Sequence, residues 1–221
     1  MKRNEKRVLI AGCIGVLLFV VWTVLIQTID VQPAGQNGTN IGFATLNHCF
    51  FNLTGVHMPL YIITDWLGLV PIAVCVIFGV VGLVQLIKRR SLFKVEIDII
   101  ILGFYYIVVI IGYLMFEMIP VNYRPIPING VMEASYPSST TLLVLCVMPT
   151  LVEQASRRVH SIVMRRSITG FSVGFSAFMV TGRLLSGVHW VTDIVGGILL
   201  SSGLFCIYKA AVMLKLKENE E

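Results

Sequence analysis

A histidine and an aspartate four residues apart, His189 and Asp193, form the pair in this sequence that is best suited to catalysis. On a helix this spacing places both side chains on one face. The carboxylate can then accept a hydrogen bond from one imidazole nitrogen, which leaves the other nitrogen free for nucleophilic attack or proton transfer. The alternative interpretation is a structural pair that caps a helix, and the pair alone does not decide between the two.

A second segment has groups that suit an anion. The run Tyr136-Pro137-Ser138-Ser139-Thr140-Thr141 comes directly before an apolar stretch. Proline is favoured in the first turn of a helix, and the exposed backbone N–H groups at a helix start bind anions readily. We therefore expect a phosphate-binding turn at residues 138–140, with ordinary N-capping by the hydroxyl groups as the alternative.

The composition indicates that membrane-spanning helices position these groups. Hydrophobic residues make up 56% of the 221 residues and charged residues only 13%, whereas soluble domains carry about 25% charged residues. A helix needs about 20 apolar residues to cross a bilayer. We predict an all-α, polytopic membrane protein with one domain over residues 1–221 and a short interfacial helix within 30–58. The six predicted transmembrane helices cover residues 8–29, 59–87, 95–116, 137–154, 167–183 and 189–208.

The basic residues predict the orientation. Fifteen of the 17 Lys and Arg residues fall in the two terminal segments, the second-to-third connection and the fourth-to-fifth connection. Six spans place these regions on one side, which the positive-inside rule makes cytoplasmic together with both termini. Topology thus explains the net charge of +5, and no nucleic-acid partner is expected. Only Arg124 and Arg183 fall on the outer side, and arginine suits bidentate binding of phosphate or carboxylate.

Taken in order, these segments resemble the motifs of the type 2 phosphatidic acid phosphatase superfamily, a group of membrane phosphatases. Gly182-Arg183, with His189 after five residues and Asp193 after three more, is similar to its third motif, Ser-Arg, five residues, His, three residues, Asp. The segment Pro137-Ser138-Ser139-Thr140 resembles its second motif, Pro-Ser-Gly-His. Arg124-Pro125 resembles the end of its first motif, Lys, six residues, Arg-Pro. The resemblance covers roughly residues 117–197.

The resemblance implies a chemistry. His189 would attack phosphorus to form a phosphohistidine, Asp193 would orient His189, and Arg183 would bind the phosphoryl oxygens. Arg124 and the turn formed by Ser138, Ser139 and Thr140 would share that binding. Such transfer is mostly positioning and charge neutralisation, so no cofactor or metal is expected. The expected partners are a phosphorylated lipid substrate and membrane lipids, in the bacterial plasma membrane with the site facing outward.

The sequence departs from the family pattern at three positions. Glu117 stands in place of the first-motif lysine, Thr140 in place of the second-motif histidine, and Gly182 in place of the third-motif serine. The missing histidine would have protonated the leaving oxygen, so we predict a preference for a pyrophosphate such as polyprenyl pyrophosphate, whose leaving group needs less help. Glu117 and Glu133 are the alternative proton donors, because burial can raise the pKa of a carboxyl group, or else they pair with an arginine.

Two other functions remain open at this stage. The first is a catalytically silent relative that binds or transports phosphorylated lipids, which the departures at Glu117 and Thr140 favour and the intact Arg183, His189 and Asp193 oppose. The second is a phosphotransferase that passes the phosphoryl group to an acceptor other than water.

Overall fold

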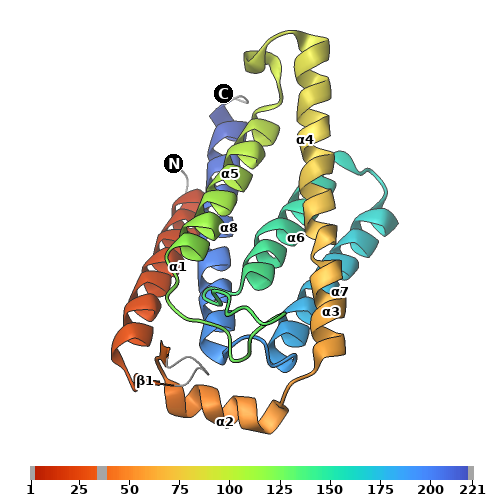
Figure 1. Ribbon diagram of the computed structural model, residues 1–221. Helices are drawn as coiled ribbons and strands as arrows, with labels where there is room; N and C mark the ends of the chain where they lie inside the picture. Colours follow the sequence, from red (N-terminus) through yellow and green to blue (C-terminus); the bar gives the residue numbers. More distant parts are fainter. Residues whose placement is uncertain (1–2, 34–38, 219–221) are drawn as a thin grey trace.

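The computed structural model describes residues 3–33 and 39–218, most of which are helical (Figure 1). Two antiparallel strands of two residues each, β1 (Gln32–Pro33) and β2 (Asn40–Ile41), follow the first helix. A short 3-10 helix, η1 (Leu92–Lys94), lies between the second and third spans. The α-helices are α1 (Arg3–Thr28), α2 (Ala44–Thr54), α3 (Met58–Leu67), α4 (Leu69–Arg89), α5 (Ile97–Met118), α6 (Ser139–Arg158), α7 (Ile162–Leu185) and α8 (Val191–Glu218).

Within the described residues, six helical segments are long and apolar enough to cross a membrane, which confirms the predicted all-α bundle. The short helix expected within residues 30–58 is α2. Several helices extend beyond their predicted bounds: α1 and α7 each begin five residues early, at residues 3 and 162, and α8 runs ten residues past residue 208. The side chain of Ser161 caps α7 by accepting a hydrogen bond from the Met164 N–H, so the basic residues Arg165 and Arg166 lie inside the helix and not before it.

The predicted second span is two helices, α3 and α4, which meet at Gly68. Pro71 lies in the first turn of α4 and has no N–H to donate to the carbonyl of Leu67, so the helical hydrogen-bond ladder is interrupted there. The Gly68 N–H instead bonds the carbonyls of Thr64 and Asp65, at 3.1 and 3.0 Å. Asp65 lies in the last turn of α3, just before this break.

Helix α8 packs against α1, α5 and α6 and lies at the centre of the bundle (Figure 1). Its closest neighbour is α1, where a Cβ atom added to Gly15 would come within 2.8 Å of the Gly203 Cα. Small residues let transmembrane helices approach this closely. Aromatic residues fill the space beside this contact, including Phe19 of α1 and Tyr136, whose rings stack with centroids 5.9 Å apart.

The two ends of the bundle differ in charge. The first turn of α1, the last turns of α8 and η1 lie at the same end (Figure 1). There Arg158 at the end of α6 binds Glu96 at 2.6 Å and Asp98, at the start of α5, at 2.9 Å. Lys209 of α8 pairs with Glu153 of α6 at 3.6 Å. The opposite end carries α2, the two short strands and the long connection between α5 and α6, and it is there that the predicted site residues lie.

Candidate active site

His189 and Asp193 come together at the start of α8, but not on one helix face as predicted. His189 lies in the connection before the helix, and Asp193 is the third residue of α8. The His189 Nδ1 is 3.7 Å from Asp193 Oδ2, which is within ion-pair range but longer than a hydrogen bond. The spacing brings the two groups together because the Asp193 carboxylate reaches back toward the residues before the helix, as acidic residues do in a capping box.

Asp193 is fully buried and held in place from two sides. Its Oδ2 accepts a hydrogen bond from the backbone N–H of Trp190 at 3.0 Å, and its Oδ1 accepts one from Asn122 Nδ2 at 3.1 Å. Sequence reasoning did not find Asn122, because nothing local marks a residue that lies 71 positions away from its partner. Asn122 fixes the carboxylate from the α5–α6 connection, and the carboxylate in turn faces the imidazole.

Helix α2 and the residues after it cover the connection that carries His189. The Asn47 side chain donates hydrogen bonds to the Gly42 carbonyl at 2.9 Å and to the Thr192 hydroxyl at 3.1 Å. Gly187 lies so close to Gly55 that an added Cβ would come within 2.1 Å of the Gly55 carbonyl oxygen. Only 4% of His189 is exposed as a result. Burial, helped by the positive charges of Arg124 and Arg183, lowers the pKa of its imidazole to about 4, so the ring is neutral near pH 7.

Arg124 and Arg183 approach each other from different parts of the chain. Both guanidinium groups lie over the ring of Tyr61, at 5.8 and 4.9 Å from its centroid. Each is buried and each binds one carboxylate through Nη2: Arg124 binds Glu133 at 3.0 Å, and Arg183 binds Asp65 at 2.8 Å. The two arginines predicted from topology therefore belong to one site, although their charges would repel each other without a shared anion.

The predicted phosphate-binding turn lies beside them at the start of α6. The Ser138 N–H donates to the Asp193 carbonyl at 3.1 Å, which joins this turn to α8. Ser138 is the N-cap residue, yet its side chain makes no capping hydrogen bond. The Ser138 hydroxyl therefore does not cap α6, contrary to the alternative interpretation. Thr140 Oγ1 accepts a hydrogen bond from Arg183 Nη2 at 2.5 Å, and Ser139 begins the helix with its N–H free of intrahelical partners.

Unpaired polar atoms gather at this site. Among the described residues, twelve buried side-chain nitrogen and oxygen atoms lack a hydrogen-bond partner, and seven of these belong to four predicted site residues. They are Nε and Nη1 of Arg124 and of Arg183, both ring nitrogens of His189, and Oγ of Ser138. Buried polar groups in proteins are nearly always paired, so this concentration points to a ligand. Six of the seven are nitrogens, and the arginine nitrogens donate only, so the ligand would be an anion.

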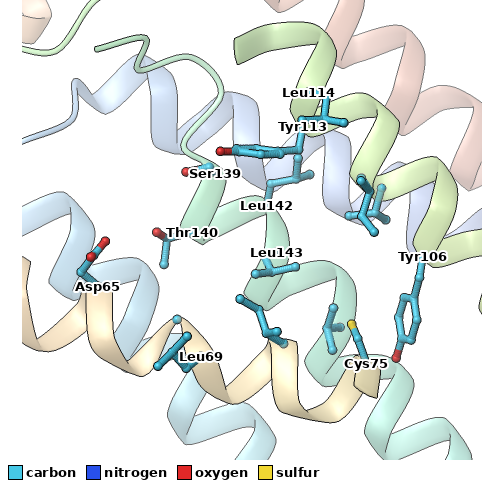
Figure 2. A pocket seen from close by; sticks show the side chains of 15 residues that line it. Asp65, Leu69, Cys75, Tyr106, Tyr113, Leu114, Ser139, Thr140, Leu142 and Leu143 are labelled. Carbon is cyan, nitrogen blue, oxygen red and sulfur yellow. The ribbon is translucent and has the colours of Figure 1, made fainter. Parts of the chain in front are cut away.

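Two cavities meet at the start of α6. A polar cavity of about 340 Å³ is lined by Arg124, Arg183, Ser139 and Thr140. An apolar cavity of about 490 Å³ runs between α4, α5 and α6 toward Cys75 and Tyr106 (Figure 2). His189 and Ser138 do not line the polar cavity. Of the described residues, no group of three or more His, Cys, Asp or Glu side chains could hold a metal ion.

The two predicted proton donors lie on the wall of the polar cavity. Glu133 forms the ion pair with Arg124, as the alternative interpretation had it. Glu117, in the last turn of α5, is exposed, and no ion pair joins it to another described residue. Gly182, in the position of the family's serine, faces α3, where an added Cβ would come within 2.7 Å of Thr64 Cγ2. The small residue allows α3 and α7 to pack closely beside Arg183.

The sequence matches no family model and none of the curated proteins with which it was compared. The structure is similar to a crystal structure described as the first transmembrane PAP2 type phosphatidylglycerolphosphate phosphatase, from Bacillus subtilis. The TM-score is 0.55 and the sequence identity is 15%, and the match covers 93% of this chain and 96% of that one. The chain has the PAP2 fold. This confirms the fold that the three motifs indicated, PAP2 being the type 2 phosphatidic acid phosphatase superfamily.

Proposed function

We propose that this protein removes phosphate from a lipid phosphate or polyprenyl pyrophosphate through a phosphohistidine at His189. The observation that carries the proposal is the group of seven unpaired buried atoms on Arg124, Arg183, His189 and Ser138. Hydrogen-bond donors that are already positioned for the charge of the transition state are the largest source of catalysis in many enzymes. The PAP2 fold supports a phosphatase and a phosphorylated lipid as its substrate.

The chain's own residues divide the work as follows. Unpaired nitrogens of Arg124 and Arg183 bind phosphoryl oxygens and neutralise their charge. His189 attacks phosphorus with Nε2, because Asp193 faces Nδ1 and stabilises the positive charge that forms on the ring. Asn122 and the Trp190 N–H hold the carboxylate toward the ring. Water then attacks the phosphohistidine, the P–N bond breaks, and phosphate leaves through the polar cavity.

The apolar cavity supports a lipid as the substrate. It shares five lining residues with the polar cavity. Several of its lining side chains from α4 and α5 are about half exposed, namely Leu69, Ile72, Ile110 and Leu114. A hydrocarbon chain can enter between these helices from the membrane while its phosphate reaches the arginines. A cavity of about 490 Å³ lies in the range that holds a single small molecule, so we propose one chain at a time.

A catalytically silent lipid-binding protein is the second candidate, because His189 does not line the polar cavity and Thr140 replaces an acid. Purified protein in detergent, supplied with phosphatidic acid, phosphatidylglycerol phosphate or polyprenyl pyrophosphate, separates the two. We expect phosphate release from at least one of these lipids. Tight binding of a lipid with no phosphate release from any of them would instead support the silent relative. Formation of the phosphate ester of an added alcohol, without release of free phosphate, would support a phosphotransferase.

A further inference from the structure

The proposed function leaves one step without a catalyst. When the P–O bond of a lipid phosphate monoester breaks, its electron pair stays on an oxygen that must gain a proton to leave as an alcohol. Thr140, at the position of the family's acid, cannot supply that proton readily, because a hydroxyl group is a weak acid at neutral pH. Its oxygen already accepts a hydrogen bond from Arg183. Another side chain must act, and the arrangement of the cavities shows where it must lie.

The leaving oxygen joins the phosphorus to the hydrocarbon chain. If the arginines hold the phosphoryl group and the apolar cavity holds the chain, this oxygen lies where the two cavities meet. Five residues line both cavities: Asp65, Tyr113, Ser139, Thr140 and Leu142. Asp65 is the only carboxyl group among them. Glu117 and Glu133 line the polar cavity alone.

Asp65 also stands beside the position of the missing acid. Its Oδ1 accepts a hydrogen bond from Arg183 Nη2 at 2.8 Å, and the same nitrogen donates to Thr140 Oγ1 at 2.5 Å. The carboxylate and the Thr140 hydroxyl are therefore neighbours across one nitrogen, the first on α3 and the second on α6 (Figure 2). The Asp65 side chain is 57% exposed and lines both cavities, so a proton can reach it and a substrate oxygen can approach it.

We propose that Asp65 is the proton donor to the leaving oxygen, an inference that rests on the proposed function. His189 Nε2 forms a bond to phosphorus, the P–O bond to the lipid breaks, and the departing oxygen takes the proton of the Asp65 carboxyl group. The lipid alcohol leaves, with Asp65 as a carboxylate. That carboxylate then accepts a proton from the water that attacks the phosphohistidine, which restores the starting state and balances the reaction.

In the proposed mechanism, Asp65 gains its proton when phosphate binds. Without phosphate, Arg183 pairs with the carboxylate. When phosphoryl oxygens bind the unpaired Nε and Nη1 of Arg183, they share its positive charge with Asp65, and the carboxylate faces a second negative group. Two such groups in one site are most stable when they share a proton. The proton comes from a singly protonated phosphate, so Asp65 becomes an acid only in the complex that needs one.

The test compares two leaving groups in the full-length protein. An amide at this position can still accept the hydrogen bond from Arg183, so Asp65→Asn keeps the arginine in place while it removes the acid. We expect kcat/KM for phosphatidic acid to fall roughly a hundred- to ten-thousand-fold. Turnover of polyprenyl pyrophosphate, whose leaving group is a phosphate, should fall less than about tenfold. The matched control Glu117→Gln, which lies in the polar cavity only, should leave the ratio of the two substrates unchanged.

Each other outcome has a distinct meaning. An equal loss on both substrates would show that Asp65 only positions Arg183, and unchanged monoester turnover would show that it does nothing to the leaving group; either overturns the proposal. Wild-type protein that hydrolyses the pyrophosphate but not the monoester would overturn it too, because the preference predicted from Thr140 would then stand. If the wild type releases phosphate from none of the three lipids named under the proposed function, the proposed function fails, and the inference fails with it.

Discussion

At the scale of single residues, the protonation state of His189 decides whether the ring can attack phosphorus. Only the neutral ring has a lone pair to offer, and burial lowers its pKa to about 4. The active form is therefore present above pH 4 and is lost as the pH falls through that value. We expect the His189 limb of the profile of kcat/KM against pH to lie near pH 4, and not near 6.5.

The measurement uses a short-chain lipid phosphate in detergent, from pH 3.5 to 8. The rates are corrected for the second ionisation of the substrate's phosphate group near pH 6. A limb that stays at pH 6.5 after this correction would contradict the burial of His189, because an exposed imidazole titrates there.

The convergence of the site residues was the part of the site that the sequence predicted best. His189, Asp193, Arg183 and Arg124 were found from spacing and charge, and the structure brings them together. Asp65 was missed because it lies 118 positions from Arg183 along the chain, in a span that reads as one apolar helix. Only the packing of α3 on α7 brings an isolated acidic residue in that span to the arginine.

At the scale of elements, the close contact of α8 with the turn before α6 fixes the position of Ser138. A Cβ atom on Gly196 would come within 2.4 Å of the Tyr136 ring. Because Tyr136 is fully buried and packs between α1 and α5, it has little room to move. We expect Gly196→Ala to cost about 1–3 kcal/mol of stability and to lower phosphate release by displacing the turn.

Gly174 of α7 is the matched control, since an added Cβ there meets nothing within 4 Å. Gly174→Ala should leave the melting temperature unchanged or raise it, because alanine favours the helix by about 1 kcal/mol. Thermal unfolding in detergent measures both variants. Equal melting temperatures for Gly196→Ala and the wild type would show that the contact between α8 and Tyr136 is not tight.

Hydropathy predicted the helix bounds well, except where polar residues continue a helix or a single residue interrupts one. Arg165 and Arg166 were read as part of a connection, yet they continue α7, because long basic side chains can extend away from an apolar surface while their backbone stays helical. The break at Gly68 was not predicted either, although Pro71 carries the signal for it. Hydropathy averages over a window and does not register a single missing N–H group.

At the scale of the whole molecule, the orientation in the membrane follows from the basic residues and is open to a direct test. Val131, in the α5–α6 connection, is 61% exposed, and Phe93, in η1 at the opposite end, is 99% exposed. In a background without the native cysteines, Val131→Cys should react with an impermeant thiol reagent in intact cells. Phe93→Cys should react only after the cells are permeabilised. The reverse pattern would place the candidate site on the cytoplasmic side.

The most direct test of the central claim is a quench-flow measurement on the His189→Ala protein with a phosphate-labelled lipid. The wild type should form an acid-labile phosphoenzyme and release phosphate, and so should His160→Ala, a control in which an exposed histidine at the other end of the bundle is removed. The His189→Ala protein, with a melting temperature like that of the wild type, should form no phosphoenzyme and release no phosphate. Wild-type turnover by that variant would contradict the account.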